Sequence, residues 1–189
     1  ARVEHVVEDR LRQITLEKKT CHLVTLYGTG RVLRDPLPTE GWKEEVWADG
    51  LANIDEQLNG VGRAYNQYRD LIYPFSNHVE ALNTIQRWFI ENTRLGIPVE
   101  FTNEGIHGLN HTLATPLPAP IAIGSTRDRD LVRGAGRIAG REASLLGYRS
   151  VYAPILDIAR DQRWGRTLEC YGEEPFVGGE LGIPNAAGV

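Results

Sequence analysis

The 189-residue sequence lacks several features that mark particular classes of protein. No apolar run approaches the roughly 20 residues that a membrane-spanning helix needs, so we expect no membrane insertion. The two cysteines, Cys21 and Cys170, are too few for a disulfide framework and too far apart for a zinc-binding spacing. The first residues include neither an initiator methionine nor a signal-peptide hydrophobic segment, which predicts a processed or clipped start.

The sequence also has no excess of basic residues. Lys and Arg number 21 against 25 Asp and Glu, for a formal net charge of −4. Proteins that bind nucleic acid or anionic membranes normally carry a basic surplus, so this balance argues against both partners. Hydrophobic residues make up 41% of the chain, which predicts a globular protein with a core.

Apolar spacing, caps and breakers predict the order of the elements. In the first half we expect helices over residues 3–13 and from Thr15 to about Tyr27, a loop over 31–41, a short strand over 51–54, a helix from Ser76 or Asn77 to before Gly96, and a strand over 97–101. The helix that begins near Ser76 has Val79, Leu82, Ile85 and Phe89 on one face. In the second half we expect an extended piece over 121–123, a helix over about 128–146, a strand over 149–153, a loop over 156–175 and a short last helix.

This alternation of strands and helices is typical of a parallel α/β sheet. A complete (β/α)8 barrel usually needs about 250 residues, and the chain has about three βα units, so we predict a partial TIM-type barrel. We divide the chain into a helical and loop lead-in over residues 1–49 and a barrel segment over 50–189. The small apolar side of the helix over 128–146 predicts close packing against the sheet. An incomplete barrel leaves strand edges unpaired, so we expect marginal stability or aggregation.

Two loops carry residues suited to chemistry. In the first, Glu104 and His107 follow a predicted strand, where a carboxylate can accept hydrogen bonds from vicinal hydroxyls. The alternatives are a loop that satisfies its own backbone and, if Glu104, His107 and His111 formed one helical face, a metal site. Gly105 and Gly108 interrupt such a face, and we expect neither a metal nor a cofactor.

The second loop, residues 157–175, combines arginines, acids and Trp164. Guanidinium groups offer paired donors to vicinal oxygens, and an indole packs on the apolar face of a sugar ring, so this composition suits a polyhydroxylated ligand. The alternative is a loop held by its own ion pairs, and we expect several of its residues to do only that.

Together these segments resemble glycoside hydrolase family 3, the family of β-glucosidases, β-xylosidases and related exo-acting enzymes. The resemblance extends from about residue 3 to residue 182. It rests on several motifs in the family's order: residues 15–19, 95–99, 103–108, 114–118, 123–126, 140–143, 153–157, 160–166 and 171–175.

The resemblance implies that the chain is roughly the N-terminal half of the family's barrel domain. It implies that Glu104, in the position of the acidic residue before the His-Gly pair, binds the terminal sugar. Many family members have Asp there. Arg166, which closes the Arg-Trp-Gly-Arg motif, would bind the same sugar, with Glu169 as its partner. We add His107 and Trp164 as candidate substrate-binding residues.

Other residues of the family's machinery are missing from the sequence. Its lysines are Lys18, Lys19 and Lys43; none precedes His, and no Trp follows Asp, whereas the family uses a Lys-His pair and an Asp nucleophile typically followed by Trp. We therefore expect the nucleophile and the acid/base beyond residue 189, and the chain alone to be inactive. Pro184 predicts that the last helix breaks after Leu181.

These observations predict the N-terminal part of a retaining exo-acting β-glycosidase that hydrolyses terminal β-linked sugars. Its expected partners are a β-linked oligosaccharide or glycoside, the remaining part of its own barrel and a further domain. The resemblance implies a periplasmic or secreted location. Two alternatives stay open: a non-catalytic sugar-binding or interaction protein of the same fold, and a metal-dependent hydrolase.

Overall fold

The computed structural model describes residues 2–27, 33–34, 37–38, 43–44, 50–55, 75–111 and 113–189. Within them a parallel sheet has the order β1-β4-β5-β6, formed by Thr25–Tyr27, Asn53–Asp55, Glu100–Glu104 and Ser150–Tyr152. These strands lie side by side in sequence order, as in a (β/α)8 barrel, whereas a doubly wound sheet reverses its order. The described residues thus form part of a TIM-type barrel, as predicted.

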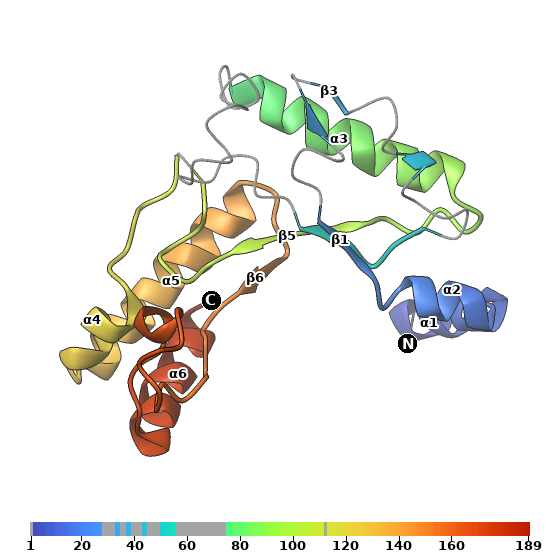
Figure 1. Cartoon of the computed structure of the whole chain (residues 1–189). Helices are drawn as coiled ribbons and strands as arrows, with labels where there is room; N and C mark the ends of the chain where they lie inside the picture. Colours follow the sequence, from blue (N-terminus) through green and yellow to red (C-terminus); the bar gives the residue numbers. More distant parts are fainter. Residues whose placement is uncertain are drawn as a thin grey trace.

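One face of this sheet packs under α3 (Phe75–Asn92), which runs along it in Figure 1. Leu26, Ile54 and Phe101 stand in one register row, and all three are buried in one core with residues of α3. Because side chains alternate along a strand, the next row, which contains Asp55 and Thr102, points to the opposite face. Glu104, two residues after Thr102, shares that opposite face.

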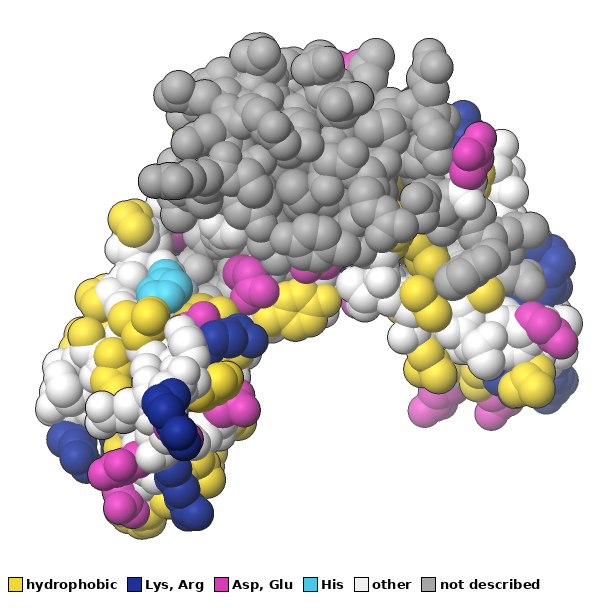
Figure 2. Space-filling view, in the orientation of Figure 1, with side chains coloured by type: hydrophobic (Ala, Val, Ile, Leu, Met, Phe, Trp, Pro, Cys, Tyr) yellow, Lys and Arg dark blue, Asp and Glu magenta, His cyan; other side chains and the backbone are white. Residues whose placement is uncertain are grey.

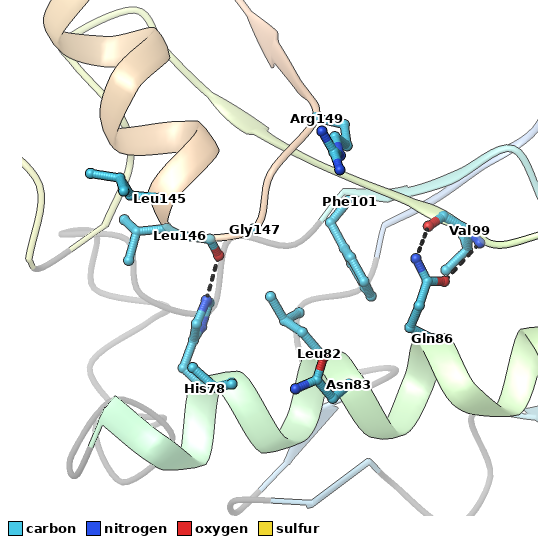
Figure 3. Close-up of a pocket in the computed structure, with 11 residues that line it drawn as sticks. His78, Leu82, Asn83, Gln86, Val99, Phe101, Leu145, Leu146, Gly147 and Arg149 are labelled. Carbon is cyan, nitrogen blue, oxygen red and sulfur yellow. Dashed lines mark hydrogen bonds between the residues drawn. The ribbon is translucent and has the colours of Figure 1, made fainter.

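The helix α3 confirms the predicted amphipathic helix with one exception. Leu82, Ile85 and Phe89 are buried, but Val79, predicted on the same face, is 42% exposed. Val79 lies instead at a cavity of about 290 Å³ between α3, the start of β5 and the end of α5 (Arg129–Leu145). Here the Gln86 side chain donates to the Val99 carbonyl oxygen at 2.8 Å and accepts from the Val99 N–H at 2.9 Å (Figure 3).

The first half of the chain departs from prediction at two places. The helix α1 (Arg2–Gln13) is as expected, and Thr15 caps α2 by accepting from the Lys18 N–H at 3.3 Å. The second helix was predicted to reach Tyr27, but α2 is only Leu16–Cys21 and β1 follows it. Pairing with β4 and burial of Leu26 in the core override helical spacing there. In the predicted loop over 31–41, β2 (Leu33–Arg34) and β3 (Leu37–Pro38) pair antiparallel.

The second half also differs from the predicted elements. The piece over 121–123 was predicted to be extended, but it belongs to the helix α4 (Pro120–Ser125). Pro120 occupies the first helical turn, where its missing N–H costs nothing, and Ile123 is buried. The strand β5 begins three residues later than predicted, at Glu100 rather than residue 97. Glu104 is therefore the last residue of the strand and not part of the loop after it.

The helices α5 and α6 (Pro175–Gly188) lie side by side. Asp128 caps α5 by accepting from the N–H groups of Asp130 and Leu131, each at 2.9 Å. The small side of α5 was expected to pack against the sheet, but most of it packs against α6. A Cβ atom at Gly136 would collide with the Asn185 carbonyl oxygen, so the two backbones meet where only glycine fits.

The predicted break in α6 at Pro184 was wrong, because the helix continues to Gly188. Proline removes one backbone hydrogen bond from a helix interior, to the carbonyl four residues before it. Leu181, Gly182 and Pro184 are nevertheless buried. Packing of this face holds α6 in the helical conformation that Pro184 alone disfavours.

Candidate functional site

Glu104 ends β5 at the carboxyl edge of the sheet, where barrel enzymes place their sites. The chain after it folds back over the strand end: the Asn110 N–H donates to the Glu104 carbonyl oxygen at 3.0 Å, and the Leu117 N–H donates to that of His107 at 2.7 Å. This segment runs through a β-bridge and turns. Glu104, His107 and His111 therefore share no helical face.

Two features hold this folded-back segment in place. Gly108 has a φ of +79°, and a Cβ atom there would collide with the Thr115 carbonyl oxygen, so the turn requires glycine. From α5, the Glu142 carboxylate accepts hydrogen bonds from the Thr115 N–H at 2.9 Å and the Thr115 hydroxyl at 2.6 Å. The segment is thus tied to α5 as well as to β5.

The folded-back segment and the region around η3 (Thr167–Glu169) enclose a cavity of about 430 Å³. Its polar lining residues are Glu104, His107, Asn110, His111, Arg166 and Glu169, and its apolar wall is formed by Ile106, Leu109, Ala114 and Pro116. Four of the five predicted site residues line this cavity. Trp164 does not: its side chain lies outside, 36% exposed.

Arg166 and Glu169 form a two-point ion pair at the cavity. The Arg166 Nε and Nη2 atoms lie 2.7 and 2.6 Å from Glu169 Oε2, and this partner raises the pKa of Arg166. Farther along the loop, Arg163 pairs with Asp161 through Nε and Nη2, at 3.0 and 2.6 Å, with both side chains exposed. The expectation that some loop residues only pair with each other is confirmed by Arg163 and Asp161.

Glu104 is half-buried, and its Oε2 atom has no hydrogen-bond partner among the described residues. Burial raises the pKa of its carboxyl group, and so does the nearby Asp55; Arg166 lowers this pKa and Glu169 adds to the rise. Glu104 is therefore an acceptor with free capacity beside a guanidinium donor. That combination can bind neighbouring hydroxyl groups of a ligand.

Sequence reasoning considered His111 only as a metal ligand, but the structure places it in the cavity wall. Its ring is 3% exposed, and Nδ1 accepts from the Leu113 N–H at 3.0 Å, so the neutral ring carries its proton on Nε2. Burial, assisted by the nearby His78, lowers the pKa of His111 to about 3. His111 is therefore neutral at ordinary pH. Among the described residues, no group of three or more His, Cys, Asp or Glu is arranged to hold a metal ion.

Two other cavities contain none of the predicted site residues. The cavity of about 290 Å³ in Figure 3 lies where β5 begins, away from the carboxyl edge. A shallower groove of about 610 Å³ runs between α4, the segment around η3 and α6. We select the cavity at Glu104 because it combines the carboxyl ends of the strands with unsatisfied polar groups.

The surface agrees with the small net charge. Acidic and basic side chains of the described residues are interspersed on the face shown in Figure 2. None of the described helices combines the length and apolar character that crossing a membrane requires.

Comparison with known proteins gives similar relatives at the level of sequence. The chain is 38% identical over 98 residues to a β-xylosidase of Formosa agariphila, covering 49% of this chain and 14% of that protein. It is 26% identical over 190 residues to β-glucosidase C of Emericella nidulans, covering 95% of this chain and 28% of that protein. Across four curated relatives, the chain spans 24%, 14%, 11% and 28% of their lengths.

Solved structures agree on the fold. The crystal structure of β-glucosidase from Listeria innocua matches with a TM-score of 0.72 and 25% identity, covering 97% of this chain and 23% of that chain. The same enzyme was also solved in complex with glucose. The model of the glycosyl hydrolase family 3 N terminal domain matches residues 59–189. The chain therefore belongs to glycosyl hydrolase family 3.

Proposed function

We propose that the chain holds the terminal sugar for a retaining exo-acting β-glycosidase of this family. The observation that carries the proposal is the cavity at the carboxyl end of β5, where Glu104, Arg166 and Glu169 line one space. Glu104 accepts from one sugar hydroxyl and Arg166 donates to a neighbouring oxygen, while Glu169 orients the guanidinium. His107, which also lines the cavity, is a further proposed contact.

The chemistry of the reaction requires further groups. A retaining glycosidase uses two carboxyl groups roughly 5 Å apart, one as nucleophile and one as general acid and then base, through a covalent glycosyl-enzyme intermediate. We propose that both groups lie beyond residue 189 in a longer parent protein, and that these 189 residues alone bind sugar without turnover. The division of the chain into a lead-in over residues 1–49 and a barrel segment over 50–189 also stays a prediction.

The proposal is tested by ligand-observed NMR with methyl β-xyloside and methyl β-glucoside. Arg166→Ala should weaken binding about 10-fold or more, because it removes a charged hydrogen-bond donor. Arg163→Ala is the matched control, since this arginine belongs to the same loop but pairs with Asp161 outside the cavity. Equal affinity of the two variants would contradict the proposed site.

In a full-length parent, Glu104→Ala should lower kcat/KM by about 100-fold or more, on the order of 3 kcal/mol. A loss below about threefold in kcat/KM would contradict the role of Glu104.

Sequencing the source gene past codon 189 separates this proposal from a non-catalytic sugar-binding protein. A frame that continues through a Lys-His pair and an Asp-Trp supports the glycosidase, and an immediate stop codon supports the alternative.

A further inference from the structure

Asp55 stands beside Glu104 at the same edge of the sheet. It is the last residue of β4 and pairs in register with Thr102, two residues before Glu104 on the neighbouring strand β5. By strand alternation, Asp55, Thr102 and Glu104 all point to the face opposite α3. The hydrogen bond from Thr102 Oγ1 to the Tyr152 hydroxyl, at 3.4 Å, agrees, because Tyr152 is the register partner of Glu104 on β6.

The two carboxyl groups are withdrawn from water. Asp55 is 6% exposed and Glu104 is half-buried. Two carboxylates that share a poorly solvated space disfavour each other's ionisation. Asp55 is the charged group that acts most strongly on the pKa of Glu104, and it raises that pKa.

The other charged groups that act on Glu104 come from the segment around η3. Arg166 lowers the pKa of Glu104, and Glu169 raises it. Arg166 already donates from Nε and Nη2 to Glu169 Oε2, with contacts of 2.7 and 2.6 Å. The positive charge of Arg166 therefore acts on Glu169 as well as on Glu104. The repulsion from Asp55 still acts on Glu104.

We propose that Asp55 is a positioning residue for Glu104: it sets the protonation of the Glu104 carboxyl group and thereby the pH range in which that group accepts hydrogen bonds from a ligand. The coupling between the carboxyl groups of Asp55 and Glu104 follows from the pairing of β4 with β5. Only its effect on the pH dependence of sugar binding rests on the proposed function.

The coupling is measured in the 189-residue chain by NMR titration of isotope-labelled glutamate, with the Glu104 signal assigned by its loss in Glu104→Gln. Asp55→Asn removes the neighbouring negative charge, so the Glu104 midpoint should fall by about 0.5 to 1 pH unit. Asp55→Glu keeps the charge and should keep a raised midpoint. A midpoint that stays within about 0.2 pH unit in Asp55→Asn overturns the proposal.

Asp130→Asn is the matched control, because this exposed aspartate at the start of α5 is not among the groups that act on Glu104. It makes the same change in net charge and should leave the midpoint in place. If Asp55→Asn does not fold, the unsubstituted chain still decides. With aspartate labelled as well, the Asp55 signal should show a second step at the midpoint of Glu104; a single independent step at Asp55 overturns the coupling.

Sugar binding across the same pH range tests the consequence. The acid limit of methyl β-xyloside binding should shift to lower pH in Asp55→Asn, in step with the Glu104 midpoint. An acid limit that stays in place while the midpoint moves overturns the functional part of the proposal. Absence of sugar binding at every pH contradicts the proposed function instead. The NMR titration then still tests the coupling between Asp55 and Glu104.

Discussion

Burial determines the protonation state of His111. Burial lowers its pKa in the folded chain to about 3, from the ordinary histidine value of 6.5. Between these two pH values the unfolded chain binds a proton that the folded chain excludes. The free energy of unfolding should therefore fall as the pH falls from 6.5 toward 3, and the buried His78, whose pKa is also lowered, acts in the same direction.

His111→Asn should flatten this dependence by about 1 kcal/mol per pH unit between pH 6 and 4, because one titrating group is lost. Asparagine keeps an acceptor for the Leu113 N–H. The measurement is urea unfolding at a series of pH values. His5→Asn, in the exposed helix α1, serves as the control and should leave the slope unchanged. Equal slopes in His111→Asn and the unsubstituted chain would rule out this account.

At the scale of elements, the pair α5 and α6 depends on backbone contact. Gly136 of α5 and Gly188 of α6 each face backbone atoms of the other helix at positions where a Cβ would be too close, and Gly140 of α5 faces the backbone of Val189, directly after α6, in the same way. Gly134, two residues before Gly136, has nothing within 4 Å of a Cβ at its position. A Cβ atom therefore fits at Gly134 but not at Gly136, because only Gly136 faces the backbone of the neighbouring helix.

Gly136→Ala should destabilise the chain by about 1–3 kcal/mol, because the added methyl group forces the helices apart. Gly134→Ala should instead stabilise it by about 0.5–1 kcal/mol, through the greater helix propensity of alanine. Chemical denaturation of both variants makes the comparison. Destabilisation of similar size in both would mean that the Asn185 contact does not govern this pair.

At the scale of the whole molecule, the four-stranded sheet has two unpaired edges within the described residues. β1 pairs only with β4 there, and β6 pairs only with β5. Open parallel edges expose unpaired backbone donors and acceptors and favour association between chains.

The purified chain should therefore be marginally stable or aggregate as its concentration rises. Size-exclusion chromatography with light scattering, followed by a thermal melt, measures this. A cooperative melt of soluble monomer above about 50 °C would be the opposite result, since that is within the usual range for stable domains.

The residues of the candidate site that belong to local sequence motifs were predictable from the sequence. Glu104, His107 and Arg166 were expected from their motifs, and Glu169 was expected as the partner of Arg166. The structure places all four around one cavity. Trp164 was expected from its ring type, yet it lies outside. Asp55 was missed because its short strand has no motif, although its place at the end of a strand was a signal that could have found it.

The sequence by itself determined the family, the helices α1, α3 and α5 and the parallel α/β class, because caps, apolar spacing and motifs act over a few neighbouring residues. Tertiary structure alone decided that residues 25–27 become a strand, that α6 runs through Pro184 and that Asp55 stands beside Glu104. These outcomes depend on strand register and on backbone contact between helices. Both bring together residues far apart in the chain, and no local pattern encodes such pairings.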